Sequence, residues 1–130
     1  MTEDDIGKVV VDTAVHIHQA LGPGLLESVY EVVLAHELRN KDLLVDRQVP
    51  IPVVYHDLKF DEGYRADLIV EGKVIIELKC VERLNNAHKK QLLTYLRLAD
   101  KRLGYLLNFS VPLMKNGITR IVDRLREQQD

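Results

Sequence analysis

The sequence is poor in cysteine and aromatic residues, and it has no long apolar run. Its 130 residues contain one cysteine, no tryptophan, five tyrosines and two phenylalanines. Because Cys80 has no second cysteine to pair with, we expect it to be a small core residue in a reducing cytoplasm. No apolar stretch approaches the length of a membrane span, and the acidic start MTEDDIGK lacks the pattern of a signal peptide. These absences predict a cytoplasmic protein with no membrane partner.

The sequence also lacks an excess of positive charge. Its net charge of −2 provides no overall attraction to nucleic acid. Acidic residues outnumber basic ones in residues 1–65, whereas the reverse holds in residues 66–130. The basic residues of the second half that could form a phosphate-facing patch are Lys89, Lys90, Arg97, Lys101, Arg102, Arg120, Arg124 and Arg126. They could equally lie on solvated helix faces, so charge neither proves nor excludes a nucleic-acid substrate.

What is present is the composition of a folded domain. Hydrophobic residues make up 46% of the chain and charged residues 29%, as in ordinary globular proteins. A chain of this length can bury one hydrophobic core, so residues 1–130 are interpreted as a single domain.

The first 40 residues predict two helices. Apolar residues recur at helical spacing over residues 4–21, and acidic residues suit the first turn. The segment Gly22-Pro23-Gly24 should end this helix, because proline cannot continue it. A second apolar stripe predicts a helix over residues 25–40.

The spacing then changes to that of strands. Residues 45–55 predict an extended strand, which Pro50 and Pro52 place at a sheet edge or bulge because each lacks a backbone donor. A polar turn with a short strand is expected over residues 56–63. Two apolar runs, 65–70 and 73–80, flank Glu71-Gly72 and predict a tight hairpin.

The remaining chain predicts a helix, a strand and an ambiguous tail. Residues 86–100 have helical spacing, and residues 103–109 form an apolar run typical of a strand buried on both faces. From residue 117 the apolar residues have helical spacing but are β-branched at the start. The element order predicts an α/β fold with a mixed central sheet flanked by helices.

Three charged residues interrupt the apolar hairpin. Because side chains alternate along a strand, Glu77 and Lys79 share a face, and the turn can bring Asp67 to that face. Buried charge is unfavourable unless it is paired or binds a metal. Two carboxylates beside an ammonium group indicate a divalent-metal site. The alternative is an edge hairpin with a weak salt bridge to Lys79.

The spacing Asp67, Glu77-Leu78-Lys79 resembles the signature of the PD-(D/E)xK nuclease superfamily. Gly24-Leu25-Leu26-Glu27-Ser28-Val29-Tyr30 fits the pattern GxxExxY. Further matching segments are His18–Pro23, Tyr64–Asp67 and Gln91–Leu96. From about residue 6 to 122 the chain is therefore similar to the GxxExxY family of that superfamily. The resemblance implies a restriction-endonuclease-like core in the order α-α-β-β-β-α-β.

The resemblance also implies roles for the hairpin residues. Asp67, Glu77 and the backbone carbonyl of Leu78 would bind Mg²⁺ or Mn²⁺, since these hard ions prefer oxygen ligands. Lys79 would position the attacking water and stabilise the transition state. A bound metal would also keep both neighbouring carboxylates ionised.

Two helices would supply further catalytic residues. Glu27 would face the metal or a water bound to it, although a carboxylate in a first turn could simply favour the helix dipole. Tyr30 is expected to pack and orient Glu27. Gln91 and Tyr95, spaced i, i+4, match the QxxxY pattern of RecB-type exonuclease domains, in which the glutamine orients the lysine or a phosphate. The same spacing would also suit the border of an amphipathic helix.

The implied function is that of a metal-dependent nuclease, a hydrolase that uses a metal-activated water to cleave DNA or RNA. Its expected cofactor is Mg²⁺ or Mn²⁺ and its partner nucleic acid, with DNA favoured over RNA. A two-fold homodimer would suit a domain this small on a duplex. The alternatives are a catalytically silent nucleic-acid- or protein-binding module on the same fold, or an enzyme acting on another phosphate-bearing molecule.

Overall fold

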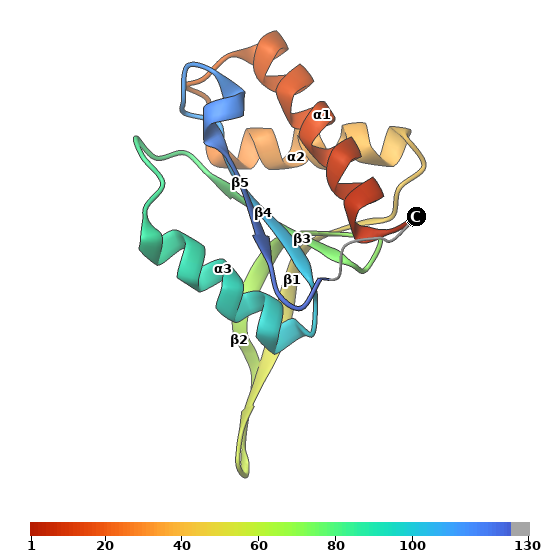
Figure 1. Cartoon of the computed structure of the whole chain (residues 1–130), viewed down its shortest axis with the longest axis vertical. Helices are drawn as coiled ribbons and strands as arrows, with labels where there is room; N and C mark the ends of the chain where they lie inside the picture. Colours follow the sequence, from red (N-terminus) through yellow and green to blue (C-terminus); the bar gives the residue numbers. More distant parts are fainter. Residues whose placement is uncertain (126–130) are drawn as a thin grey trace.

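The computed structural model describes residues 1–125, which form a five-stranded mixed sheet with helices packed against it (Figure 1). The elements in chain order are α1 Glu3–Leu21, α2 Glu27–Asn40, β1 Val45–Tyr55, β2 Leu58–Val70, β3 Val74–Lys79, α3 Asn86–Ala99, β4 Leu103–Asn108, the short 3-10 helix η1 Met114–Gly117 and β5 Ile118–Val122. The mixed α/β fold is thus confirmed, with β5 added after the predicted elements. No helix within residues 1–125 is long and apolar enough to cross a membrane.

The boundaries of α1 and α2 follow from local chemistry. Thr2 and Asp5 form a capping box at the start of α1, and Gly22 ends the helix at a φ of 71°. The predicted second helix begins two residues later than expected, at Glu27, because Leu26 is still extended with ψ 145°. This places Glu27 in the first turn of α2.

The sheet order is β1-β2-β3-β4-β5. Only the β3–β4 pair is parallel among the strand pairs of residues 1–125, and α3 is the crossover that joins these two strands. Strand β4 is buried along its whole length, as predicted for a strand covered on both faces. The ambiguous tail is a strand: β5 pairs antiparallel with β4 from Leu107↔Ile118 to Leu103↔Val122.

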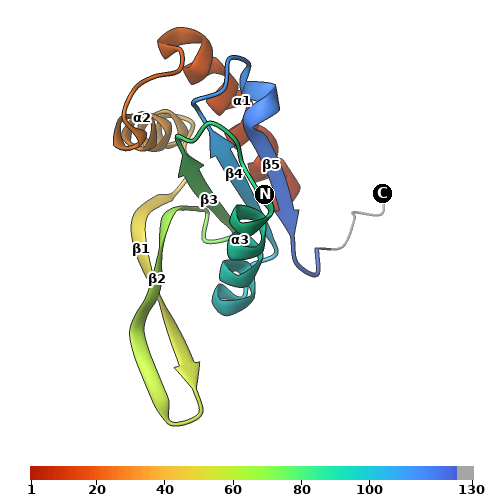
Figure 2. The ribbon, with the colours of Figure 1, turned by 90° about the vertical axis from the view of Figure 1, so that its left-hand side faces the viewer.

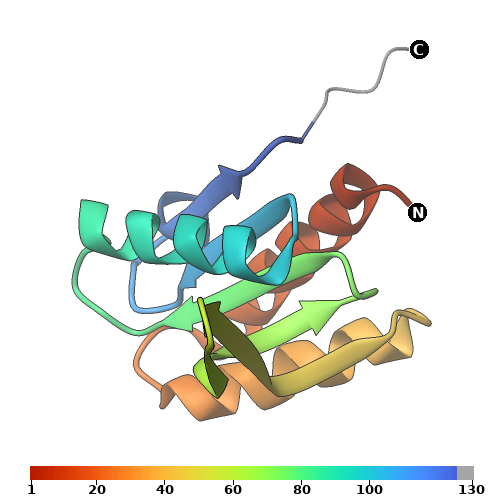
Figure 3. The same ribbon diagram turned by 90° about the horizontal axis from the view of Figure 1, so that it is seen from below.

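The two faces of the sheet are covered differently (Figure 3). Helices α1 and α2 pack on one face, where they and the sheet share the larger apolar cluster. Helix α3 covers the other face with Leu92 and Leu96, which pack against Ile75 and Leu106 of the sheet. Because successive residues of β3 alternate between these clusters, the strand is buried on both sides.

Strands β1 and β2 extend beyond the body of the molecule as a two-stranded arm (Figures 1 and 2). The turn predicted within residues 56–63 lies at His56 and Asp57, but the strand that follows is not short, because β2 runs unbroken from Leu58 to Val70. The pairs Val53↔Phe60 and Tyr55↔Leu58 hold the arm together around a tight turn. The polar residues of this segment reflect exposure to solvent on a projecting strand, and they do not end it.

Strand β1 is an edge strand, as its prolines predict. Pro50 pairs with Arg65, whereas Pro52 lies at an irregularity in the register between Ile51 and Val53. Neither proline removes a donor that a third strand would need.

Candidate active site

The carboxylates lie where β2 and β3 separate. The hairpin turns at Glu71 and Gly72, whose φ angles of 54° and 64° suit a tight two-strand turn. The described β2–β3 pairing ends at Leu68↔Ile76. The next residue on each strand, Asp67 on β2 and Glu77 on β3, carries one of the two predicted metal ligands.

Asp67 and Glu77 contact one another across this gap. The backbone N–H of Asp67 donates to Glu77 Oε1 at 3.3 Å, and the backbone N–H of Leu78 donates to Asp67 Oδ2 at 2.9 Å. The hairpin therefore brings together the two carboxylates that the sequence places ten residues apart, with Leu78 beside them.

Glu77 is held in an unfavourable environment for a charge. Its exposed fraction is only 6%. Burial is the main cause that raises the pKa of Glu77 to about 9, followed by the negative charge of Asp67. Without a cation Glu77 is therefore protonated at neutral pH, whereas a cation between the two carboxylates would favour its ionised form.

Lys79 lies two residues along β3 from Glu77, on the same face, and is half-buried. Within residues 1–125 its ammonium group has no carboxylate partner at ion-pair distance. Its charge nevertheless acts to lower the pKa of both Glu77 and Glu27. The lysine is thus close to the acidic cluster without being bound to it.

Glu27 approaches the pair from the start of α2. The pKa of Glu27 is raised, first by partial loss of solvation and then by the charge of Asp67. Among the residues that the structure describes, however, no three His, Cys, Asp or Glu side chains converge as a metal cluster. Glu27 is therefore near Asp67 but does not complete a three-carboxylate site.

Tyr30 positions the start of α2. Its ring is fully buried and stacks on Phe109, with ring centroids 4.4 Å apart. Its hydroxyl donates to the Gly22 carbonyl and accepts a hydrogen bond from the Leu25 N–H. By bracing the loop that precedes α2, Tyr30 holds Glu27 in place, in agreement with the packing role that the sequence suggests.

The predicted pair Gln91 and Tyr95 lies on α3. Burial, and next the charge of Glu77, raise the pKa of Tyr95, whereas a hydrogen bond with the Gln91 side chain lowers it. The Tyr95 ring stacks on Tyr64 of β2 with centroids 3.7 Å apart, and the Tyr64 hydroxyl donates to the Tyr95 carbonyl at 2.8 Å. These contacts hold the middle of α3 over the side of the hairpin that carries Glu77.

A polar cluster beside Asp67 was not predicted. Glu31 of α2 is buried and accepts hydrogen bonds from Arg47 and Gln48 of β1, and Gln48 also donates to Asp67. One signal was present in the sequence: Glu31 lies three residues before Leu34 on the buried side of α2. A glutamate among buried helix positions requires a partner.

Three of the basic residues that could form a phosphate-facing patch are paired with carboxylates. Arg97 pairs with Asp123, Arg120 with Asp4, and Arg124 with both Asp100 and Asp123. Lys89 and Lys90 are exposed at the start of α3, and Arg126 lies outside the described residues. These ion pairs leave the second half of the chain less attractive to phosphate than its composition suggests.

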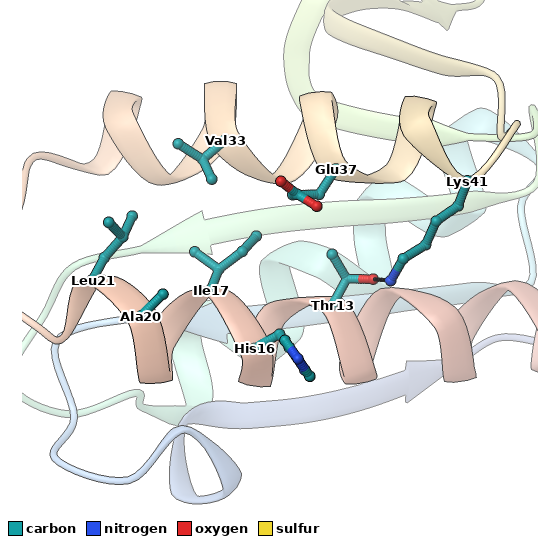
Figure 4. A pocket seen from close by; sticks show the side chains of 8 residues that line it. All are labelled: Thr13, His16, Ile17, Ala20, Leu21, Val33, Glu37 and Lys41. Atoms are coloured by element: carbon teal, nitrogen blue, oxygen red, sulfur yellow. Dashed lines mark hydrogen bonds between the residues drawn. The ribbon is translucent and has the colours of Figure 1, made fainter.

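A separate cavity of about 480 Å³ lies between α1 and α2, away from the carboxylates (Figure 4). Its apolar floor includes Ile17 and Val33, and Lys41 donates a hydrogen bond to the Thr13 hydroxyl at one end. None of its lining residues is a predicted site residue.

The protein is an α/β domain whose β2–β3 hairpin carries two neighbouring carboxylates, Asp67 and Glu77. A family model described as the PD-(D/E)XK nuclease superfamily matches residues 4–121. The match spans most of the chain, so the protein belongs to the PD-(D/E)XK nuclease superfamily. In the comparison with curated proteins, none matches the chain.

Proposed function

We propose that this chain is a metal-dependent nuclease that hydrolyses the phosphodiester bonds of nucleic acid, with DNA favoured over RNA. We also propose that residues 1–130 form one nuclease domain of the GxxExxY type. The observation that carries it is the approach of Asp67 and Glu77 where β2 and β3 separate, with Lys79 beside them. Two neighbouring carboxylates at this position are unfavourable when both are ionised, unless a cation compensates their charge.

The oxygen atoms at this position suit Mg²⁺ or Mn²⁺. In an extended strand the N–H and C=O of one residue point to the same side, so the Leu78 carbonyl lies on the side of Asp67, to which its N–H donates. Asp67, Glu77 and this carbonyl would hold the ion, and water would fill the other positions, as Mg²⁺ prefers. When bound, the ion would supply Lewis-acid stabilisation of the phosphoryl group and an activated water nucleophile.

The surrounding side chains have separate roles in this proposal. The ammonium group of Lys79, which has no carboxylate at ion-pair distance in residues 1–125, would donate to the attacking water and stabilise negative charge that develops on the phosphate. Glu27 would bind a water in the outer coordination shell, because it lies near Asp67 without joining it. Gln91 would orient a substrate phosphate, with Tyr95 holding the glutamine by a hydrogen bond.

The test is a calorimetric titration of Mn²⁺ and Mg²⁺ combined with cleavage of labelled DNA and RNA. We expect the wild type to bind metal and to cleave in its presence, and Asp67→Ala to lose both. Asp57→Ala, which removes an exposed carboxylate at the tip of the arm, is the matched control. A wild type that binds neither ion at millimolar concentration would exclude the catalytic role.

A second candidate function is a silent binding module on the same fold. The observation that favours it is that, within the part of the chain that the structure describes, no three His, Cys, Asp or Glu side chains converge as a metal cluster. Metal-independent binding of labelled DNA without cleavage would support this candidate over the nuclease.

A further inference from the structure

We infer that Gln48 of β1 is a positioning residue for the metal ligand Asp67, and that buried Glu31 of α2 holds Gln48 in place. This inference rests on the proposed metal site, and it adds two residues that the sequence motifs do not include. It links α2, β1 and β2 through side-chain hydrogen bonds.

The amide of Gln48 bridges two carboxylates. Gln48 lies opposite Asp67, between the pairs Arg47↔Leu68 and Val49↔Ala66. Its Nε2 donates to Glu31 Oε1 at 2.7 Å and faces Asp67 Oδ1 at 3.4 Å. Because only the nitrogen of the amide can donate, two carboxylate acceptors fix its orientation.

Glu31 is a rigid anchor for this amide. The residue is 5% exposed, and its second oxygen, Oε2, accepts hydrogen bonds from Arg47 Nε at 3.2 Å and Nη2 at 2.9 Å. A buried carboxylate with both oxygens occupied by donors has little freedom to move. The Gln48 amide is therefore tied at one end to the body of α2.

The backbone of Gln48 is also unusual. Its φ of 52° lies in the left-handed region, which is unfavourable for a residue with a side chain. On one side of it Arg47 reaches Glu31 of α2, and on the other side Val49 packs with the cluster under α3. Residues two apart in a regular strand point to the same face of the sheet. Because Arg47 and Val49 point to opposite faces, the regular alternation of side chains in β1 is interrupted at Gln48.

The alternation of side chains in β2 is interrupted in the same way at Asp67, the residue opposite Gln48. Ala66 belongs to the cluster under α3, whereas Leu68 belongs to the cluster under α1 and α2. Asp67 lies between them, at the position where the side chains of both strands switch from one face of the sheet to the other. A carboxylate at such a position needs contacts on both sides to keep one orientation.

Asp67 has these contacts. Gln48 meets its Oδ1, and the Leu78 N–H donates to its Oδ2. Each oxygen keeps a lone pair for a cation, while rotation of the carboxylate is restricted. Outer contacts of this kind orient metal ligands, and their loss typically weakens metal binding by roughly 10–100-fold.

The test compares Mn²⁺ affinity in Gln48→Met and Gln48→Gly with that of the wild type. Methionine keeps the side-chain length but has no donor, and glycine also relieves the left-handed backbone. We expect both variants to bind Mn²⁺ at least about tenfold more weakly, with thermal stability of the glycine variant equal to or above wild type. Gln19→Met, at an exposed position of α1, is the control.

A second readout separates positioning from general support of the fold. Cleavage kinetics should show a lower kcat in Gln48→Met, with KM for nucleic acid unchanged. The double variant Gln48→Met/Glu31→Gln should lose no more Mn²⁺ affinity than the more affected single variant, because the two residues act through one contact. If Gln48→Gly is at least as stable as the wild type but still binds Mn²⁺ more weakly, a purely structural role for Gln48 is excluded.

The two proposals fail in different ways. Wild-type Mn²⁺ affinity in a folded Gln48→Gly variant overturns the role of Gln48, whether or not the wild type cleaves nucleic acid. A wild type that binds Mn²⁺ but cleaves neither DNA nor RNA overturns the nuclease proposal. The Mn²⁺ affinities of the wild type and the Gln48 variants can still be compared in that case.

Discussion

The two faces of the sheet differ in what they bury. Helices α1 and α2 cover one face with an extended apolar cluster, whereas α3 covers the other with a smaller one (Figure 3). The difference is visible in two successive residues of β3: Ile76 is fully buried on the α1/α2 face, and Glu77 is buried with a raised pKa on the α3 face. One face stabilises the fold, and the other can therefore hold groups that destabilise it.

The largest expected effect tests the stabilising face. Ile76→Ala should lower the free energy of unfolding by about 2–5 kcal/mol, because it leaves a cavity in the larger cluster. Urea denaturation measures this loss. Metal affinity of the folded variant should be unchanged, and a loss of Mn²⁺ binding in folded Ile76→Ala would contradict the division between the faces.

The second prediction concerns pH on the opposite face. Because the folded-state pKa of Glu77 is about 9, against an ordinary value of 4.5, the metal-free folded protein holds a proton that the unfolded chain releases. This contribution to stability is complete below pH 4.5 and is lost as the pH rises through about 9. Glu77→Gln cannot ionise and should escape the loss.

Thermal and urea unfolding between pH 5 and pH 9 without metal should therefore show a steeper decline for wild type, by up to about 5 kcal/mol. Adding Mn²⁺ at pH 8 should stabilise the wild type but not Glu77→Gln. Parallel pH profiles for the two proteins would show that Glu77 is not desolvated as described.

The smallest effect is expected at the edge of the site. Glu27→Gln should weaken Mn²⁺ binding by about tenfold or less, since Glu27 lies near Asp67 without completing a metal cluster. Glu3→Gln is the matched control, because Glu3 lies in the first turn of α1 and shares any effect of the helix dipole. Equal changes in Mn²⁺ affinity in the two variants would show that Glu27 acts only through the helix dipole and has no role at the metal site.

The main elements and the hairpin that carries the site could be predicted because their signals are local. Helical spacing, the stop at Gly22-Pro23-Gly24 and the turn at Glu71-Gly72 depend on neighbouring residues alone. The family match over residues 4–121 confirms the superfamily, and the assignment of roles to Asp67, Glu77 and Lys79 stays a prediction.

What could not be predicted depends on contacts between distant segments. The left-handed backbone of Gln48 has no signal in the sequence, because it is held by Glu31 and Asp67 from other elements. The ion pair of Arg120 with Asp4 joins the last strand to the first helix, so composition alone overstated the free positive charge. Likewise, β5 is a strand because β4 offers it an edge.

The projecting β1–β2 arm has a consequence for how the protein opens to solvent. Tyr55 and Phe60 near its tip are 64% and 52% exposed, so few packing contacts oppose fraying of its backbone hydrogen bonds. Its amide protons should exchange with solvent through small local openings, whereas those of the buried strand β4 should require global unfolding. Gln48 and Asp67 lie between the exposed arm and the buried part of the sheet, and we expect local opening of the arm to end before it reaches the carboxylates.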